Sequence, residues 1–307
     1  MGKLQGIISK ISGSAGNVTF KLRSGETIVS EKVTQVRNPR TNAQMQTRTR
    51  WGNIIAMYKG IRPLLNYGFE NKPKTLSDYN MSVKLNMQRT PIYLTKQAVA
   101  GGACIATGYQ ISQGSLPAIV VTGTEQNGVT DIRLGGESLT NNTTVAEFSA
   151  AVVNNNADYR YGDQISFFLV KQKVNENTQI PYCQFSAAKV ILDAANENKL
   201  VDEVEGSHGF ASVDGKLGHS GNDGDCAYAW VHTRKSDGKT LVSSQELLSA
   251  NSKEAEYKGD AAYNLSKSSY GSSIESFLVP DGNATGSTSG SGDDNGGGNG
   301  GGGNDTL

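Results

Sequence analysis

One long helical pattern, between residues 37 and 69, limits the folds that this chain can adopt. Pro39 restricts the residue before it to an extended conformation, so the helix must begin after this point. Thr41 and Gln44 have the spacing of a capping box, in which two side chains satisfy amides at the start of a helix. Apolar side chains then recur at intervals of three and four residues, which places them on one helix face. These residues are Trp51, Ile54, Tyr58, Ile61 and Leu65.

The polar side of this predicted helix is basic. Pro63 has no amide hydrogen, so we expect the helix to end or kink near Arg62. No acidic residue lies between Glu31 and Glu70. The basic residues, which are our candidate partner-binding residues, are Arg37, Arg40, Arg48, Arg50, Lys59 and Arg62. They form either the solvated face of a helix packed on a sheet or a surface that binds an acidic partner, either another subunit or nucleic acid.

Charge is unevenly distributed along the chain, although the formal net charge is zero. The first 75 residues contain 13 lysines and arginines and 3 acidic residues, whereas the remainder contains 16 and 26. A basic head and an acidic body favour head-to-tail assembly of protein subunits, and a basic head also suits nucleic acid.

Residues 1–90 predict a β-meander followed by two helices, which is an α+β arrangement. The segments 4–11, 17–23 and 26–33 are rich in residues that favour strands, and turns of small residues separate them. A second helix is expected to begin at Ser77.

From residue 91 the pattern changes to short β segments, so the fold class is expected to be mainly β. Residues 91–280 predict an antiparallel, Ig-like β-sandwich. The expected strands are 92–96, 104–112, 117–122, 163–170, 185–193, 226–234, 239–244 and 272–280. The turn at Asp237-Gly238 favours a tight hairpin. Thr144 and Glu147 form a second capping-box pattern, which predicts a short helix.

The C-terminal residues 281–307 consist almost entirely of glycine and small polar residues, so a disordered tail is expected. The N-terminus lacks the apolar core of a signal peptide, and no apolar run is long enough to span a membrane. Three widely spaced cysteines without a CxxC pair argue against a disulfide framework or a zinc knuckle.

No catalytic motif or nucleotide-binding fingerprint is present, which predicts a protein that is not an enzyme and needs no cofactor. The loop 206–225 concentrates residues that can bind metals. They are His208, Asp214, His219, Asp223 and Asp225. Their spacing matches no metal-binding motif, so we expect a solvated loop and predict no metal.

The segment that contains Asn38-Pro39-Arg40-Thr41, Gln44 and Arg48 resembles a family of gut Bacteroidales and phage proteins. That family is known as a domain of unknown function, and similar segments occur in small phage virion proteins. The segments GIISKISGSAGNVTF, ISQGSLP and HTRKSDGK are also similar to this family. The resemblance implies a shared fold and a virion setting, but it supports function less strongly than fold.

Two functional hypotheses follow. The first is a structural or assembly protein of a phage virion, such as a head decoration or head fibre, which binds protein subunits through its basic N-terminal region. The second is a nucleic-acid-binding accessory protein that uses the basic helix 41–62. Neither hypothesis includes a membrane, and both place the protein in a virion or the host cytoplasm.

Deletion of residues 281–307 is expected to leave the thermal midpoint of unfolding unchanged within experimental error. Such a segment makes few contacts with the folded chain because it contains almost no apolar side chains. Differential scanning calorimetry of the truncated and full-length chains checks this expectation. A clearly lower midpoint for the truncated chain would mean that the tail docks on the body.

Overall fold

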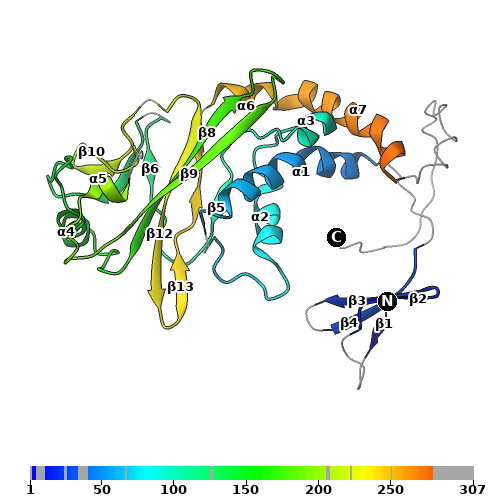
Figure 1. Ribbon diagram of the computed structural model, residues 1–307, viewed down its shortest axis with the longest axis horizontal. Helices are drawn as coiled ribbons and strands as arrows, with labels where there is room; N and C mark the ends of the chain where they lie inside the picture. Colours follow the sequence, from blue (N-terminus) through cyan, green and yellow to red (C-terminus); the bar gives the residue numbers. More distant parts are fainter. Residues whose placement is uncertain are drawn as a thin grey trace.

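The computed structural model describes residues 2–4, 11–23, 26–33, 41–65, 68–124, 127–204, 208–221, 223–249 and 251–278. Within these residues the protein is mainly β, with several antiparallel sheets and a smaller share of helix (Figure 1). The predicted mainly β class is therefore confirmed. Arg37, Arg40 and the tail 281–307 lie outside the described residues, so the predictions about them stay predictions.

The helices are α1 (Asn42–Ile61), α2 (Asp78–Asn86), α3 (Lys96–Ala100), α4 (Val145–Asn155), α5 (Leu200–Glu203), α6 (Ser252–Glu256) and α7 (Gly259–Leu278). The N-terminal strands are β1 (Gly2–Leu4), β2 (Gly13–Ala15), β3 (Val18–Arg23) and β4 (Glu26–Glu31). The next strands are β5 (Gln110–Ser112), β6 (Val121–Thr122), β7 (Val129–Arg133), β8 (Gln164–Val174) and β9 (Pro181–Ile191). The last are β10 (Ala211–Val213), β11 (Lys216–Gly218), β12 (Cys226–Ser236), β13 (Lys239–Val242), β14 (Gln245–Glu246) and β15 (Leu248–Ser249).

The N-terminal strands form a small antiparallel sheet in the order β1-β4-β3-β2. Alternation along β3 and its register with β4 place Val18, Phe20, Leu22 and Val29 on one face. Leu22 is 49% exposed and the other three are half-buried. None of the described residues of this sheet belongs to the hydrophobic clusters of the protein, so this apolar face is not part of the main core.

The central sheet has the order β13-β12-β8-β9, and β15 also pairs with β12. The register places Phe167 opposite Trp230 and Phe168 opposite Ala229. Since side chains alternate along a strand, the large aromatic pair faces one layer and the smaller pair faces the other. The long strands β8 and β12 are therefore buried on both faces.

Helix α1 packs on the small-residue face of this sheet, beside α2 and α7 (Figure 1). Ala227 and Ala229 leave room for the helix, which contributes Ile54 and other apolar residues to the same cluster. The helix also approaches β9 closely at Gly60, where a Cβ atom would lie 2.2 Å from the ring of Phe185. Small residues on both elements thus fix the spacing between helix and sheet.

The other face of the central sheet packs on α4 and on a second antiparallel sheet, β10-β11-β7-β6. Phe148 of α4, Ile132 of β7 and Leu217 of β11 join Phe167 and Trp230 in one core. Two antiparallel sheets therefore share a core, as a sandwich requires. An Ig-like sandwich is not confirmed, because helix α4 contributes to the common core and α1 covers the outer face of the central sheet.

Residues on both sides of position 90 belong to one hydrophobic core, since Ile54 and Ile61 pack with Phe168 and Val231. The expected boundary between 1–90 and 91–280 therefore does not separate two cores. The physical reason is that α1 carries an apolar face and that the central sheet needs a cover on its small-residue side.

A buried segment without regular structure, residues 103–109, passes between α1 and the central sheet. Asn53 of α1 accepts a bond from the Ile105 amide (2.7 Å) and donates to the Ile105 carbonyl (2.9 Å). Gln172 of β8 accepts from the Ala106 amide (2.9 Å) and donates to the Cys104 carbonyl (3.1 Å). These amide side chains replace a neighbouring strand, so the strand expected at 104–112 is present only at 110–112.

Several local predictions are confirmed. Helix α1 begins after the N-cap Thr41 and ends at Ile61, and α2 begins after the N-cap Ser77. Both bonds of the capping box between Thr144 and Glu147 are present. The hairpin at Asp237-Gly238 also forms, and both residues have positive φ angles as its tight turn requires.

Other local predictions are wrong. Residues 272–278 of the expected strand 272–280 instead form the end of α7, because that segment continues a helix that packs beside α1 and α3. Gln44 does not complete a capping box, since its Oε1 atom is buried and makes no hydrogen bond. The expected strand 92–96 is also absent, and α3 begins at Lys96.

Replacement of Asn53 by alanine is expected to lower the free energy of unfolding by about 2–5 kcal/mol, because buried amide and carbonyl groups of Ile105 lose their partner. Urea denaturation of the variant and the parent chain measures this change. Gln46→Ala is the matched control, because Gln46 is exposed on the same helix and its loss should cost about 0.5 kcal/mol or less. Equal losses for the two variants would contradict the role of Asn53.

Candidate functional site

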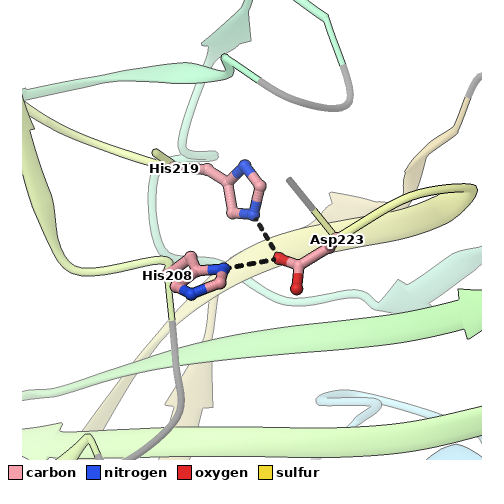
Figure 2. Close-up of side chains that lie close together, drawn as sticks. All are labelled: His208, His219 and Asp223. Carbon is pink, nitrogen blue, oxygen red and sulfur yellow. Dashed lines mark hydrogen bonds and ion pairs between the residues drawn. The ribbon is translucent and has the colours of Figure 1, made fainter. Parts of the chain in front are cut away.

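Three side chains of the loop 206–225 gather at one point beside the central sheet (Figure 2). His208 lies before β10, His219 directly follows β11, and Asp223 lies shortly before β12. The short hairpin β10–β11 brings the two histidines together, because its antiparallel strands return the chain to its starting point. Residues 205–207 and 222 lie outside the described residues.

Asp223 is the centre of this cluster. Its Oδ2 atom lies 3.1 Å from Nδ1 of His208 and 2.8 Å from Nε2 of His219. Its other oxygen, Oδ1, pairs with Nζ of Lys171 from β8 at 2.7 Å. The two carboxylate oxygens therefore have different partners, with the histidines on one and the lysine on the other.

The cluster is largely buried. The His219 side chain is 0% exposed and that of Asp223 is 1% exposed, whereas His208 is 46% exposed. The His219 ring stacks on Tyr228, with ring centroids 4.7 Å apart, and also on Phe167. The prediction of a solvated loop is therefore wrong at His219 and Asp223, because aromatic side chains of the central sheet cover His219 and the Asp223 carboxylate is buried with it.

Burial raises the pKa of Asp223, but hydrogen bonds from Lys171, His219 and His208 outweigh it and lower the pKa to about 2. The carboxylate is thus an anion at neutral pH. Together with the two histidine nitrogens it presents three ligand atoms within 4.8 Å of one another, the donor types that transition metals bind. Asp214 is in the β10–β11 turn, and Asp225 accepts a bond from Ser252, so neither belongs to this group.

A second buried aspartate, Asp163, lies at the start of β8. His232 Nε2 lies 2.9 Å from its Oδ2 atom, and Arg234 binds both of its oxygens at 2.7 and 2.6 Å. Burial raises the pKa of Asp163, but hydrogen bonds from Arg234 and His232 outweigh this effect and lower the pKa to about 2. The ring of Tyr159 stacks on His232 at 4.4 Å, beside a polar pocket of about 300 Å³.

The predicted basic residues of α1 divide into two groups. Arg50 is half-buried, and its guanidinium donates to the Met87 carbonyl at 3.3 Å and lies over the Tyr93 ring. Arg48 is also half-buried. Lys59 and Arg62 are exposed at the C-terminal end of the helix. Of the four predicted residues that the structure describes, only Lys59 and Arg62 are exposed.

Arg62 borders a pocket of about 260 Å³ between α1, α2 and β5. Its lining mixes apolar and polar side chains, including Met57, Ile111, Asp78 and Asn86. Such a pocket can accept a mixed apolar and polar side chain, but it contains no histidine or cysteine and no paired carboxylates for acid–base chemistry.

Sequence reasoning missed the pairing of Asp163 with His232 and Arg234. One signal was available, because His232 and Arg234 are two residues apart on a strong strand and must face the same side. The position of Asp163 opposite them depends on the pairing of β8 with β12, which the sequence pattern did not reveal.

The chain matches no protein-family model, and it matches neither a curated protein nor a solved structure. The resemblance to the Bacteroidales and phage family therefore has no support from these comparisons. Among the described residues, no helix has both the length and the apolar character needed to cross a bilayer.

Replacement of Asp163 by asparagine is expected to lower the free energy of unfolding at pH 7 by about 3 kcal/mol, because Arg234 and His232 lose a buried anion. The low pKa of about 2 for Asp163, against an ordinary 3.8, means that its stabilising effect is full above about pH 5. It is lost as the pH falls toward 2.

The stability of the parent chain and the variant should therefore converge as the pH falls from 5 to 2. Urea unfolding at a series of pH values measures this convergence. Asp214→Asn is the control, since Asp214 lies in an exposed turn. A constant difference between parent and Asp163→Asn at all pH values would contradict the assigned ion pair.

Proposed function

We propose that the protein is a non-enzymatic structural or assembly protein, whose basic N-terminal region binds the acidic far end of a second copy. The observation that carries this proposal is the N-terminal sheet. Its face with Val18, Phe20, Leu22 and Val29 contributes to no hydrophobic cluster among the described residues. An apolar sheet face of this kind is typical of a segment that completes its packing on another chain.

The distribution of charge favours a second copy as the partner. Lys21 and Lys32 are exposed in or beside the N-terminal sheet, within the region of excess positive charge. Figure 1 draws α4 and α5 at the opposite end of the molecule from this sheet. The exposed acids of these two helices and of the chain between β9 and α5 are Glu147, Asp193, Glu197, Asp202 and Glu203. Contacts between unlike ends of identical chains produce head-to-tail assemblies.

Nucleic acid is the less favoured partner. Arg50 is engaged with Met87 and Tyr93, so the polar face of α1 is not a continuous basic stripe. The exposed basic residues that remain on α1, Lys59 and Arg62, form a short positive end that suits an acidic protein surface. Phosphate binding along a duplex instead uses several cations in register.

The buried aspartates support a role without catalysis. Asp163 and Asp223 each have a lowered pKa and fixed cationic partners, whereas a general acid or base needs a pKa near the working pH. The setting of the assembly rests on the resemblance of the segment from Asn38 to Arg48 to phage proteins. We therefore propose a virion component, such as a head decoration or head fibre.

Two variants of the basic region and one of the acidic end test this proposal by sedimentation velocity. Leu22→Glu places an acid on the apolar face of the N-terminal sheet. Lys59→Glu with Arg62→Glu reverses the charge at the C-terminal end of α1. Each should weaken self-association at least tenfold, because like charges then face each other. Asp202→Lys with Glu203→Lys should do the same, and a mixture of the two double variants should associate again.

Lys173→Glu with Lys189→Glu is the matched control, since both lysines are exposed on the central sheet and the change in net charge is equal. Circular dichroism confirms that each variant is folded. A parent chain that stays monomeric at all concentrations, or variants that associate as the parent does, would refute the proposal. DNA binding that weakens steeply with salt and is lost in the Lys59 and Arg62 variant would instead favour nucleic acid.

A further inference from the structure

We infer that His208, His219 and Asp223 bind one divalent transition-metal ion, of which Zn²⁺ is the best fit. This site is separate from the proposed assembly surfaces, and it does not depend on them. The two imidazole nitrogens and the carboxylate oxygen lie within 4.8 Å of one another. Two histidines and one carboxylate are a donor set that zinc commonly uses, with bonds of about 2.0–2.2 Å.

Two of the three distances between ligand atoms need only small adjustments to accept an ion. Ligand atoms around a tetrahedral zinc lie about 3.3 Å apart, as its bond lengths dictate. Oδ2 of Asp223 already lies 2.8 Å from Nε2 of His219 and 3.1 Å from Nδ1 of His208. An ion that replaces the two hydrogen bonds would move the histidines slightly apart from the carboxylate. It would also bring the two histidine nitrogens, which lie within 4.8 Å of each other, closer together, and the exposed His208 side chain has room to make this movement. Each coordinating nitrogen must then be unprotonated, with any proton carried on the other ring nitrogen.

The surroundings hold two of the three ligands in place. Lys171 pairs with Oδ1 of Asp223 and leaves Oδ2 directed at the histidines. Hydrogen bonds of this kind on the second carboxylate oxygen orient ligands in metal sites. The stacked rings of Tyr228 and Phe167 fix the plane of His219. An ion would therefore meet two ligands that are already held in place, and most of the reorganisation would fall on His208.

The site is open on one side. His208 is half exposed, so an ion can enter from solvent and water can occupy its fourth position. Asp225 is not part of this cluster, and its Oδ2 atom accepts a hydrogen bond from Ser252 of α6. The bound ion would join the two ends of the β10–β11 hairpin to the chain before β12, across 15 residues from His208 to Asp223. Its expected role is thus to stabilise this loop.

The test is a calorimetric titration of the full chain with Zn²⁺, after removal of any histidine affinity tag. One ion per chain is expected to bind, and the thermal midpoint should rise with zinc concentration. His208→Ala should weaken binding at least tenfold, because it removes one ligand, and the exposed side chain can be lost without unfolding the protein. Asp214→Asn, an acid of the same loop outside the cluster, should bind zinc as the parent does.

Co²⁺ provides a second readout that identifies the ligands. A four-coordinate site of nitrogen and oxygen ligands should give visible absorption without a thiolate-to-metal charge-transfer band. Absence of zinc binding at millimolar concentration would overturn the inference, and so would unchanged affinity in His208→Ala. A thiolate band would also overturn it, since it would assign the ion to Cys104, Cys183 or Cys226.

Discussion

The fold depends on hydrogen bonds to a backbone segment that is buried without a neighbouring strand. Residues 103–109 lie in the interior, where each amide and carbonyl must find a partner or destabilise the protein. Asn53 and Gln172 supply these bonds from α1 and β8, and Asn251 donates to the Ala106 carbonyl from the start of α6. The same three amides thereby connect the helix layer, the central sheet and the C-terminal helices.

Local signals in the sequence were sufficient where the structure is local. Thr41 and Thr144 mark helix starts, and Asp237-Gly238 marks a hairpin, because caps and tight turns depend on residues a few positions apart. The segment 103–109 could not be recognised in this way. Its residues favour strands, but three of its partners are single amide side chains that lie 52 to 145 positions away in the chain.

The candidate sites show the same limit. The loop with His208, His219 and Asp223 was recognisable as a concentration of metal-binding residue types, but no standard spacing identified the three that meet. Their meeting depends on the return of a short hairpin and on a lysine from β8. Likewise, helical periodicity identified the basic side of α1 but not the engagement of Arg50, because Met87 and Tyr93 come from later segments.

The small residues between α1 and the central sheet have a consequence for variation in this protein. Gly60, Ala227 and Ala229 set the height of the helix above the strands. A larger side chain at any of them would lift α1 and carry Lys59 and Arg62 with it, because a helix moves as a rigid body. Substitutions at these three residues would therefore change the positions of exposed charges, although Ala227 and Ala229 are themselves buried.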